Sequence, residues 1–216
     1  MKAARDPFGR LNGARANGVR LFLHNMQSPI NIGMALRVAE TYATPVAVFD
    51  PAGAFTHADR AKTISDFGCG ALQRVGYTPI EDVQVFRAAL AQRGQRLIAT
   101  AVAGDAAWAD KFEFLRGDVI AIGNEYDGLP QDLIDGADAV VRIRMADVWT
   151  PKPLSHSPID PGRNKPVANN GAPNLNAAMS AGILCYIAHL ALRPSVAEQT
   201  PAKRTARRPA SKAKRA

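Results

Sequence analysis

Polar and glycine residues gather in three short clusters of this chain, and each cluster follows a segment that has the pattern of a strand. They span residues 25–37, 123–130 and 173–186. Open α/β sheets bind ligands at the carboxyl ends of their strands, so the three clusters are candidates for one shared site. Arg37 is the residue most suited to chemistry there, because its guanidinium stays charged and can stabilise negative charge on an oxygen.

Arg37 lies in an otherwise apolar helical segment, six residues after Asn31 in the stretch SPINIGMALRVAETYATPVAVFD, residues 28–50. Its position predicts a side chain on the buried approach of this helix to the following strand. The alternative is a solvated arginine on the polar face of an amphipathic helix. The segment by itself leaves both interpretations open.

The elements that must position these clusters are strands alternating with helices. Near-continuous apolar runs predict buried parallel strands at 19–24, 45–50, 96–102, 118–123 and 139–145, with a weaker strand near 72–77. Helical patterns occupy residues 32–42, 58–65, 81–94 and 176–192. This alternation predicts an α/β fold: a mostly parallel, doubly wound sheet with helices on both faces.

Length and charge predict one folded domain, residues 1–193, followed by a basic tail. The chain has 216 residues and a formal charge of +8. Residues 194–216 hold seven basic residues and one acidic residue, with few apolar side chains, and therefore predict a disordered tail. This tail is either an arm that contacts nucleic-acid phosphates or a solubilising extension. Residues 149–174 are rich in Pro, Asn, Ser and Gly and predict a long loop.

Several classes of protein are excluded by missing motifs. No apolar run is long enough to span a membrane, and the first residues lack the apolar core of a signal peptide, which predicts a cytoplasmic protein. Cys69 and Cys185 fit neither a disulfide framework nor a metal site and are interpreted as reduced structural thiols. No Gly-x-Gly-x-x-Gly turn follows the first strand, which argues against dinucleotide binding. Among the histidines, only His24, beside the first cluster, is a candidate for acid-base chemistry.

Together the three clusters resemble the motifs of the SpoU, or TrmH-like, branch of the SPOUT methyltransferases, over roughly residues 19–190. The matching residues are Asn31, Ile32, Gly33 and Arg37 in motif one, Gly123, Asn124, Glu125, Gly128 and Leu129 in motif two, and Asn174, Leu175 and Asn176 in motif three. The chain departs from the family at Asn174, where Ser is common. Its connection between residues 145 and 174 is also longer than in compact members.

The resemblance implies a fold, a cofactor and an activity. The fold would carry a deep trefoil knot at its carboxyl-terminal end, formed by the second and third motifs. The activity would be transfer of a methyl group from S-adenosyl-L-methionine to a ribose 2′-hydroxyl in RNA, either tRNA or rRNA, by a homodimer. The cofactor contacts carried over from the family are Thr100, Ala101, Gly123, Ile143, Asn174 and Leu175. Taken alone, Gly123 and Gly128 would be interpreted as turn glycines.

The resemblance also assigns catalytic roles. Arg37 would act on the target hydroxyl, while Asn31, Glu125 and Asn176 would position Arg37 and the knot loops, with Asn176 also a candidate helix cap. Glu125 has a simpler alternative role as a salt-bridge partner of Arg37. Two other functions remain open: a non-catalytic RNA-binding protein with the same fold, and methylation of a base nitrogen, against which the first motif argues.

Overall fold

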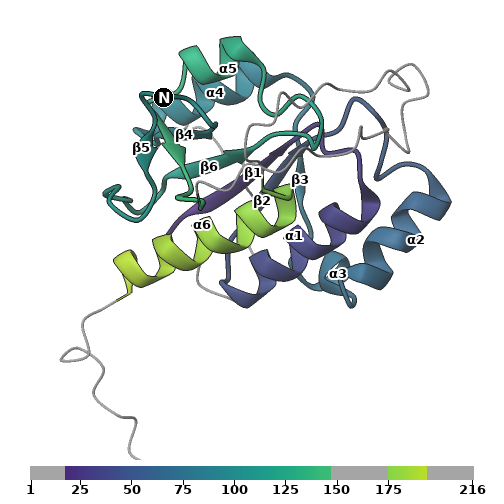
Figure 1. Ribbon diagram of the computed structural model, residues 1–216. Coiled ribbons are helices and arrows are strands. Elements are labelled where there is room, and N and C mark those ends of the chain that lie inside the picture. The colour runs from purple at the N-terminus through teal and green to yellow at the C-terminus, as the bar shows by residue number, and fades with distance from the viewer. Residues whose placement is uncertain (1–17, 147–174, 194–216) are drawn as a thin grey trace, which may run out of the picture.

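The computed structural model describes residues 18–146 and 175–193. Its centre is a seven-stranded sheet in the order β3-β2-β1-β6-β4-β7-β5, and every pairing is parallel (Figure 1). The strands are β1 (Arg20–His24), β2 (Val46–Phe49), β3 (Thr78–Pro79), β4 (Leu97–Thr100), β5 (Ala107–Trp108), β6 (Val119–Ile122) and β7 (Ala139–Arg142). The predicted parallel sheet is confirmed. The basic tail, the loop 149–174 and Asn174 lie outside the described residues.

Helices cover both faces of the sheet, as predicted. They are α1 (Pro29–Thr41), α2 (Ala58–Phe67), α3 (Ala71–Val75), α4 (Val83–Gln92), α5 (Gln131–Asp135) and α6 (Ala177–Leu192). Figure 1 shows α1, α2, α3 and α6 on one side and α4 and α5 on the other. Among these helices, none is long and apolar enough to cross a lipid bilayer.

Alternating side chains of the central strands build the two halves of the core. In β1, Leu21 and Leu23 pack with α1 and α6, whereas Phe22 packs with Phe86 and Leu90 of α4. This alternation follows from the two-residue period of a strand. Because both faces are buried, the strands appear as continuous apolar runs in the sequence.

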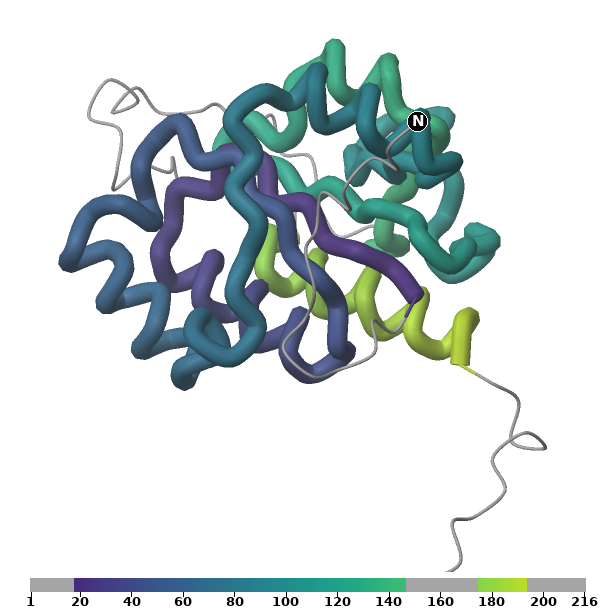
Figure 2. Tube along the Cα trace, turned by 180° about the vertical axis from the view of Figure 1, so that it is seen from behind, coloured from purple at the N-terminus to yellow at the C-terminus, as the bar shows by residue number. Residues whose placement is uncertain are grey.

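The two ends of the described chain lie side by side. Figure 2 shows the start of β1 next to the end of α6. The Arg116 guanidinium donates a hydrogen bond of 2.8 Å to the Leu192 carbonyl oxygen, and the Gly117 N–H donates one of 2.6 Å to the Gly18 carbonyl oxygen. The loop before β6 therefore holds both chain ends.

The predicted strand at 72–77 is wrong, since residues 71–75 form the short helix α3. Leu72 and Val75 lie three positions apart, and both pack against the core from a helix. The two-residue strand β3 begins only at Thr78. No pattern in the sequence predicted α5 and β5, because elements of two to five residues are too short to show a hydrophobic period.

Helix α1 is anchored by its cap and by a close contact with α2. Ser28 caps the helix by accepting a hydrogen bond from the Asn31 N–H, and Pro29 occupies the first helical position. At Gly33 the backbone lies so near α2 that an added Cβ would be 2.5 Å from the Ile64 carbonyl oxygen and 2.8 Å from the Gly68 nitrogen. A glycine is therefore required for α1 to approach α2 this closely.

We expect Gly33→Ala to lower the free energy of unfolding by about 1–3 kcal/mol, because the new methyl group overpacks the contact between α1 and α2. The matched control is Gly182→Ala in α6, where the nearest atom to an added Cβ is Val38 Cγ2 at 3.6 Å. That control should be neutral or more stable by up to about 1 kcal/mol, since alanine favours helices. Urea denaturation of both variants measures the difference. A Gly33→Ala protein as stable as the wild type would contradict the contact.

Candidate functional site

Glu125, in the loop after β6, binds the segment that leads into α1. One carboxylate oxygen accepts a hydrogen bond from the Gln27 N–H at 2.9 Å. The other accepts from the Ser28 N–H at 3.2 Å and from the Asn31 side-chain amide at 2.9 Å. A carboxylate near a helix amino terminus is also favoured by the helix dipole. Glu125 thus joins motif two to motif one.

Asn176 extends this network to the third motif. Its side-chain amide donates to the Asn31 Oδ1 at 2.9 Å, and its own Oδ1 accepts from the N–H groups of Ala178 and Met179 at the start of α6. The predicted helix cap is confirmed. The structure therefore brings together Asn31, Glu125 and Asn176, whose positions lie as far as 145 residues apart. We call these three side chains the motif network.

The loop from Gly123 to Leu129 is held by its own hydrogen bonds. The Asn124 Oδ1 accepts from the N–H groups of Tyr126 and Asp127, each at 2.8 Å, and Gly128 adopts a left-handed φ of 72°. A Cβ added to Gly123 would lie 2.1 Å from the Gly128 carbonyl carbon. Gly123 is therefore already required by the folding of this loop back on itself, whatever it does for a ligand.

The residues proposed to contact the cofactor collect at one edge of the sheet. Thr100 ends β4 and Ala101 follows it, while Gly123 and Ile143 follow the neighbouring strands β6 and β7. The Ala101 N–H donates to the Val141 carbonyl oxygen at 3.1 Å. Leu175 directly precedes Asn176 of the motif network in the sequence.

Arg37 lies apart from the motif network. Its side chain is exposed on α1, so the prediction of a buried approach to a strand is wrong, because this position falls on the helix face turned away from the sheet. Within the described residues, no hydrogen bond or ion pair joins it to Glu125, whose oxygens bind the Asn31 segment instead. The Arg37 Nη1 contacts the Cys69 Sγ at 3.2 Å.

The two cysteines occupy opposite environments. Cys185 is buried, and burial raises its pKa to about 12, so it remains a protonated thiol. Cys69 is exposed at the turn between α2 and α3, beside Arg37. The interpretation of both cysteines as structural thiols did not include the contact of Cys69 with Arg37. Only its position between Gly68 and Gly70 marks it as a turn residue.

His24 is buried at the end of β1 between aromatic rings. Its ring centroid lies 5.8 Å from that of Phe22 and 5.1 Å from that of Phe49. The loss of hydration on burial lowers its pKa, which favours the neutral imidazole. No hydrogen bond among the described residues links His24 to Arg37 or to the motif network.

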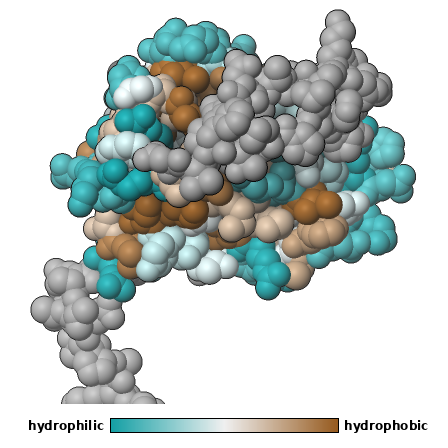
Figure 3. Space-filling model, viewed as in Figure 1, coloured by the Kyte–Doolittle hydropathy of each residue, from teal (hydrophilic) through white to brown (hydrophobic). Residues whose placement is uncertain are grey.

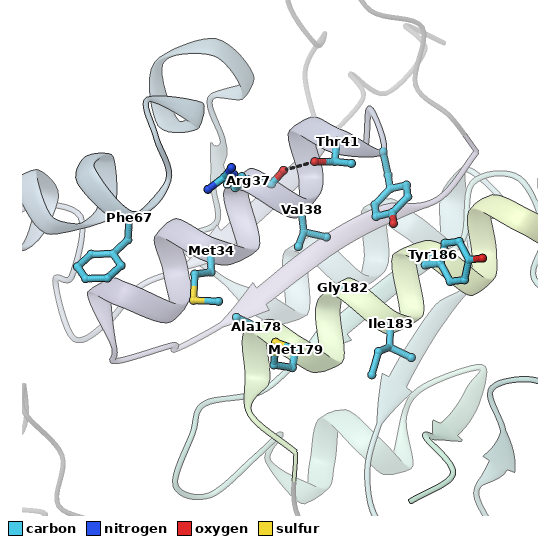
Figure 4. A pocket seen from close by; sticks show the side chains of 11 residues that line it. Met34, Arg37, Val38, Thr41, Phe67, Ala178, Met179, Gly182, Ile183 and Tyr186 are labelled. Atoms are coloured by element: carbon cyan, nitrogen blue, oxygen red, sulfur yellow. Dashed lines mark hydrogen bonds between the residues drawn. The ribbon is translucent and has the colours of Figure 1, made fainter.

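An open groove of about 450 Å³ runs between α1 and α6, and Arg37 is on its wall (Figure 4). Its apolar lining includes Met34, Phe67, Met179 and Tyr186, which are between 37% and 50% exposed. Figure 3 shows hydrophobic surface along this part of the molecule. A charged guanidinium therefore stands beside an exposed apolar face.

Comparison with known proteins gives the family. The model of the SpoU rRNA Methylase family matches residues 18–149. No curated protein matches the chain.

Similar solved structures share the fold at low identity. The A. aeolicus TrmH/SpoU tRNA modifying enzyme is 16% identical with a TM-score of 0.63, covering 82% of this chain and 76% of that one. A structure described for 2-OH methylation of C/U34 on tRNA is 23% identical with a TM-score of 0.62, covering 82% and 98%.

A third similar structure is the SpoU methyltransferase AviRb from Streptomyces viridochromogenes, solved also in complex with AdoMet. Without AdoMet it is 22% identical with a TM-score of 0.58, covering 82% of this chain. The present chain spans 61% of AviRb's length. At these sequence identities, the similar structures show only that the fold is shared. The match of the family model over residues 18–149 shows that this chain belongs to the SpoU rRNA methylase family.

Proposed function

We propose that this protein is an S-adenosyl-L-methionine-dependent RNA methyltransferase of the cytoplasm that methylates a ribose 2′-hydroxyl in tRNA or rRNA. The observation that carries the proposal is the motif network, in which one side chain from each of the three family motifs takes part in a single set of hydrogen bonds. We also propose that the second and third motifs form a trefoil knot.

The edge formed by β6, β4 and β7 has a composition that suits the cofactor. Ala101, Gly123 and Ile143 follow adjacent parallel strands and carry no charged side chain. An adenosine group needs apolar surface together with backbone hydrogen-bonding groups, and strand ends supply both. With Thr100, Asn174 and Leu175, these residues would hold S-adenosyl-L-methionine. When bound, the cofactor supplies an electrophilic methyl group.

Arg37 serves the acceptor in this proposal. A ribose hydroxyl is a poor nucleophile, and negative charge develops on its oxygen as its proton leaves. The guanidinium of Arg37 stabilises that charge, because it is cationic, exposed and free of a carboxylate partner among the described residues. Arg37 remains protonated throughout, so the proton of the hydroxyl passes to a phosphate oxygen of the RNA or to solvent water. The motif network fixes the start of α1 and thereby the helix that carries Arg37.

Arg37 lies apart from the motif network along α1, so one chain leaves the surroundings of Arg37 open. This arrangement supports a homodimer, in which a second chain covers that surface. The outward face of α1 presents Ile30 and Met34 before Arg37, at helical spacing, and α6 presents Met179 and Tyr186 in the same way. Exposed apolar stripes of this kind are typical of interfaces. A second copy on this groove would cover the apolar face and bring a neighbouring surface to Arg37, completing the site across two chains.

RNA is the substrate and the partner of this protein in the proposal. The basic residues of 194–216 would act as an arm that contacts phosphates without reading the sequence. In the alternative function, an RNA-binding protein without catalysis, the residues at the ends of β6, β4 and β7 would not bind the cofactor.

We expect the purified protein to transfer a labelled methyl group from S-adenosyl-L-methionine to tRNA or rRNA, and the product to resist alkaline hydrolysis at the modified position. Alkaline cleavage of RNA requires a free 2′-hydroxyl, so resistance identifies ribose methylation. Label in a nucleotide that alkali still releases would indicate base methylation instead. Calorimetry that detects RNA binding but no cofactor binding would favour the non-catalytic alternative.

We expect Arg37→Ala to reduce methyl transfer by about 10²–10³-fold, as removal of a group that stabilises developing charge does. The dissociation constant for S-adenosyl-L-methionine should change by less than about twofold, because Arg37 serves the acceptor. Single-turnover assays and calorimetry measure the two effects. The matched control is Arg87→Ala on α4, an arginine that bonds the Gly136 carbonyl oxygen on the opposite face. Activity within a few-fold of wild type in Arg37→Ala would refute the assignment.

We expect wild-type protein to be a dimer in solution and Met179→Glu to be a monomer, because the new charge would be buried at the interface. Met179 is 49% exposed in the single chain. Val85→Glu is the matched control, since Val85 is 66% exposed on α4. Light scattering after size-exclusion chromatography gives the masses. A monomeric wild type, or dimers of equal strength in both variants, would exclude this groove as the interface.

A further inference from the structure

We propose that Cys69 is a positioning residue for Arg37: the turn between α2 and α3 places the Cys69 thiol against the guanidinium and orients it toward the acceptor. The inference rests on the proposed role of Arg37 in methyl transfer. It concerns a residue outside the three motifs, and no pattern in the sequence connects it with Arg37.

The position of Cys69 is set by the contact between α1 and α2. Gly33 of α1 lies against the end of α2, where a Cβ on Gly68 would be 3.2 Å from the Gly33 carbonyl oxygen. Cys69 follows Gly68 directly, and Arg37 lies one helical turn beyond Gly33. The glycine contact therefore brings residues 37 and 69 together although 32 positions separate them.

The backbone at Cys69 is held in an uncommon conformation. Its φ of 50° lies in the left-handed region, which residues other than glycine rarely adopt. Its N–H donates to the Asp66 carbonyl oxygen at 3.1 Å, and its carbonyl oxygen accepts from the Arg74 Nη2 at 2.8 Å. Both backbone groups of Cys69 are thus held by hydrogen bonds that fix the turn. In this fixed turn the thiol contacts Arg37.

Arg74 also ties this turn to α1. It pairs through two nitrogens with the carboxylate of Glu40, with its Nη2 2.8 Å from the Glu40 Oε2. This hydrogen bonding is the main cause that lowers the pKa of Glu40, and the charge of Arg37 contributes less. Glu40 is three residues from Arg37 on the same helix face. Because Glu40 is occupied by Arg74, it does not form an ion pair with Arg37.

A thiol is suited to hold a guanidinium that must act on a substrate. The Cys69 sulfur lies 3.2 Å from the Arg37 Nη1 and is a weak hydrogen-bond acceptor. It orients one nitrogen while leaving the positive charge uncompensated and the other N–H groups available. A carboxylate at the same place would bind the guanidinium more strongly and offset its charge. Cys69 therefore gives Arg37 direction without neutralising it.

We expect Cys69→Ala to lower kcat by about fivefold to thirtyfold. The lower limit is the effect of losing one hydrogen bond, and the upper limit is the effect of a small misplacement of a catalytic group. KM for S-adenosyl-L-methionine should change less than about twofold. Cys69→Ser, which keeps an acceptor, should recover most of kcat. The matched control is Lys62→Ala, which removes an exposed ion pair with Asp66 on α2 and should leave kcat unchanged.

A second measurement does not depend on activity. In ¹⁵N relaxation of the arginine side chains, the Arg37 Nε should become more mobile in Cys69→Ala and be as ordered as in wild type in Cys69→Ser. Unchanged Arg37 mobility in Cys69→Ala would overturn the inference. So would a normal kcat in Cys69→Ala while Arg37→Ala is inactive. If Cys69→Ala does not fold, the mobility of the Arg37 Nε is compared between Cys69→Ser and the wild type. A serine variant in which Arg37 is mobile would contradict positioning by a hydrogen-bond acceptor at this site.

If Arg37→Ala keeps full activity, the proposed catalytic role of Arg37 fails, and the relaxation experiment still reports whether Cys69 orders its side chain. The failure of the proposed function and the failure of this inference therefore give different results.

Discussion

The carboxylate of Glu125 is the interaction on which the arrangement of the site depends. It accepts three hydrogen bonds from the entry to α1, two from backbone N–H groups and one from Asn31. Backbone donors at a helix start have no partner within the helix, so a carboxylate there satisfies groups that would otherwise need water. Through Asn31 the same network reaches Asn176 and the cap of α6. One side chain thereby links the end of β6 to two helices.

Helix α1 consequently connects two different environments. Its first turn belongs to the motif network, its middle is pressed against α2 at Gly33, and its later turns carry Arg37 and Glu40 toward the turn after α2. A rigid helix transmits the position of its start to every residue along it. The orientation of Arg37 is therefore governed by contacts at both ends of the helix, although Arg37 itself bonds to neither Asn31 nor Glu125.

Among the described residues, no carboxylate forms an ion pair with Arg37, although the carboxylate of Glu40 lies on the same helix face. Some exposed or half-exposed arginines in the described part of the chain have carboxylate partners, such as Arg74 with Glu40 and Arg96 with the buried Asp118, whereas Arg87 and Arg116 bind backbone carbonyl oxygens. Arg37 instead lies on an apolar groove and touches a thiol. A cation without a direct salt bridge attracts an anionic oxygen more strongly than one that is paired with a carboxylate. The apolar groove and the free charge belong to the same face of the molecule.

The sequence by itself determined the features that depend on neighbouring residues. The apolar runs predicted the five central strands, and the short polar side chain of Asn176 before an apolar helix predicted its cap, because strand period and capping are local properties. Family motifs identified Asn31, Glu125 and Asn176 as partners in one site. Residues 72–77 were predicted wrongly, since a short apolar run fits a strand or one helical turn equally well until packing selects the helix.

Only the tertiary structure decided which way Arg37 faces, that Glu125 binds the start of α1 rather than Arg37, and that Cys69 lies beside Arg37. The contact between Arg37 and Cys69 joins residues 32 positions apart, and the bond between Glu125 and Gln27 joins residues 98 apart. Such contacts follow from how closely two helices dock and from the order of strands in the sheet. Those are properties of the packed chain, set by the summed burial of many side chains, and no local pattern encodes them.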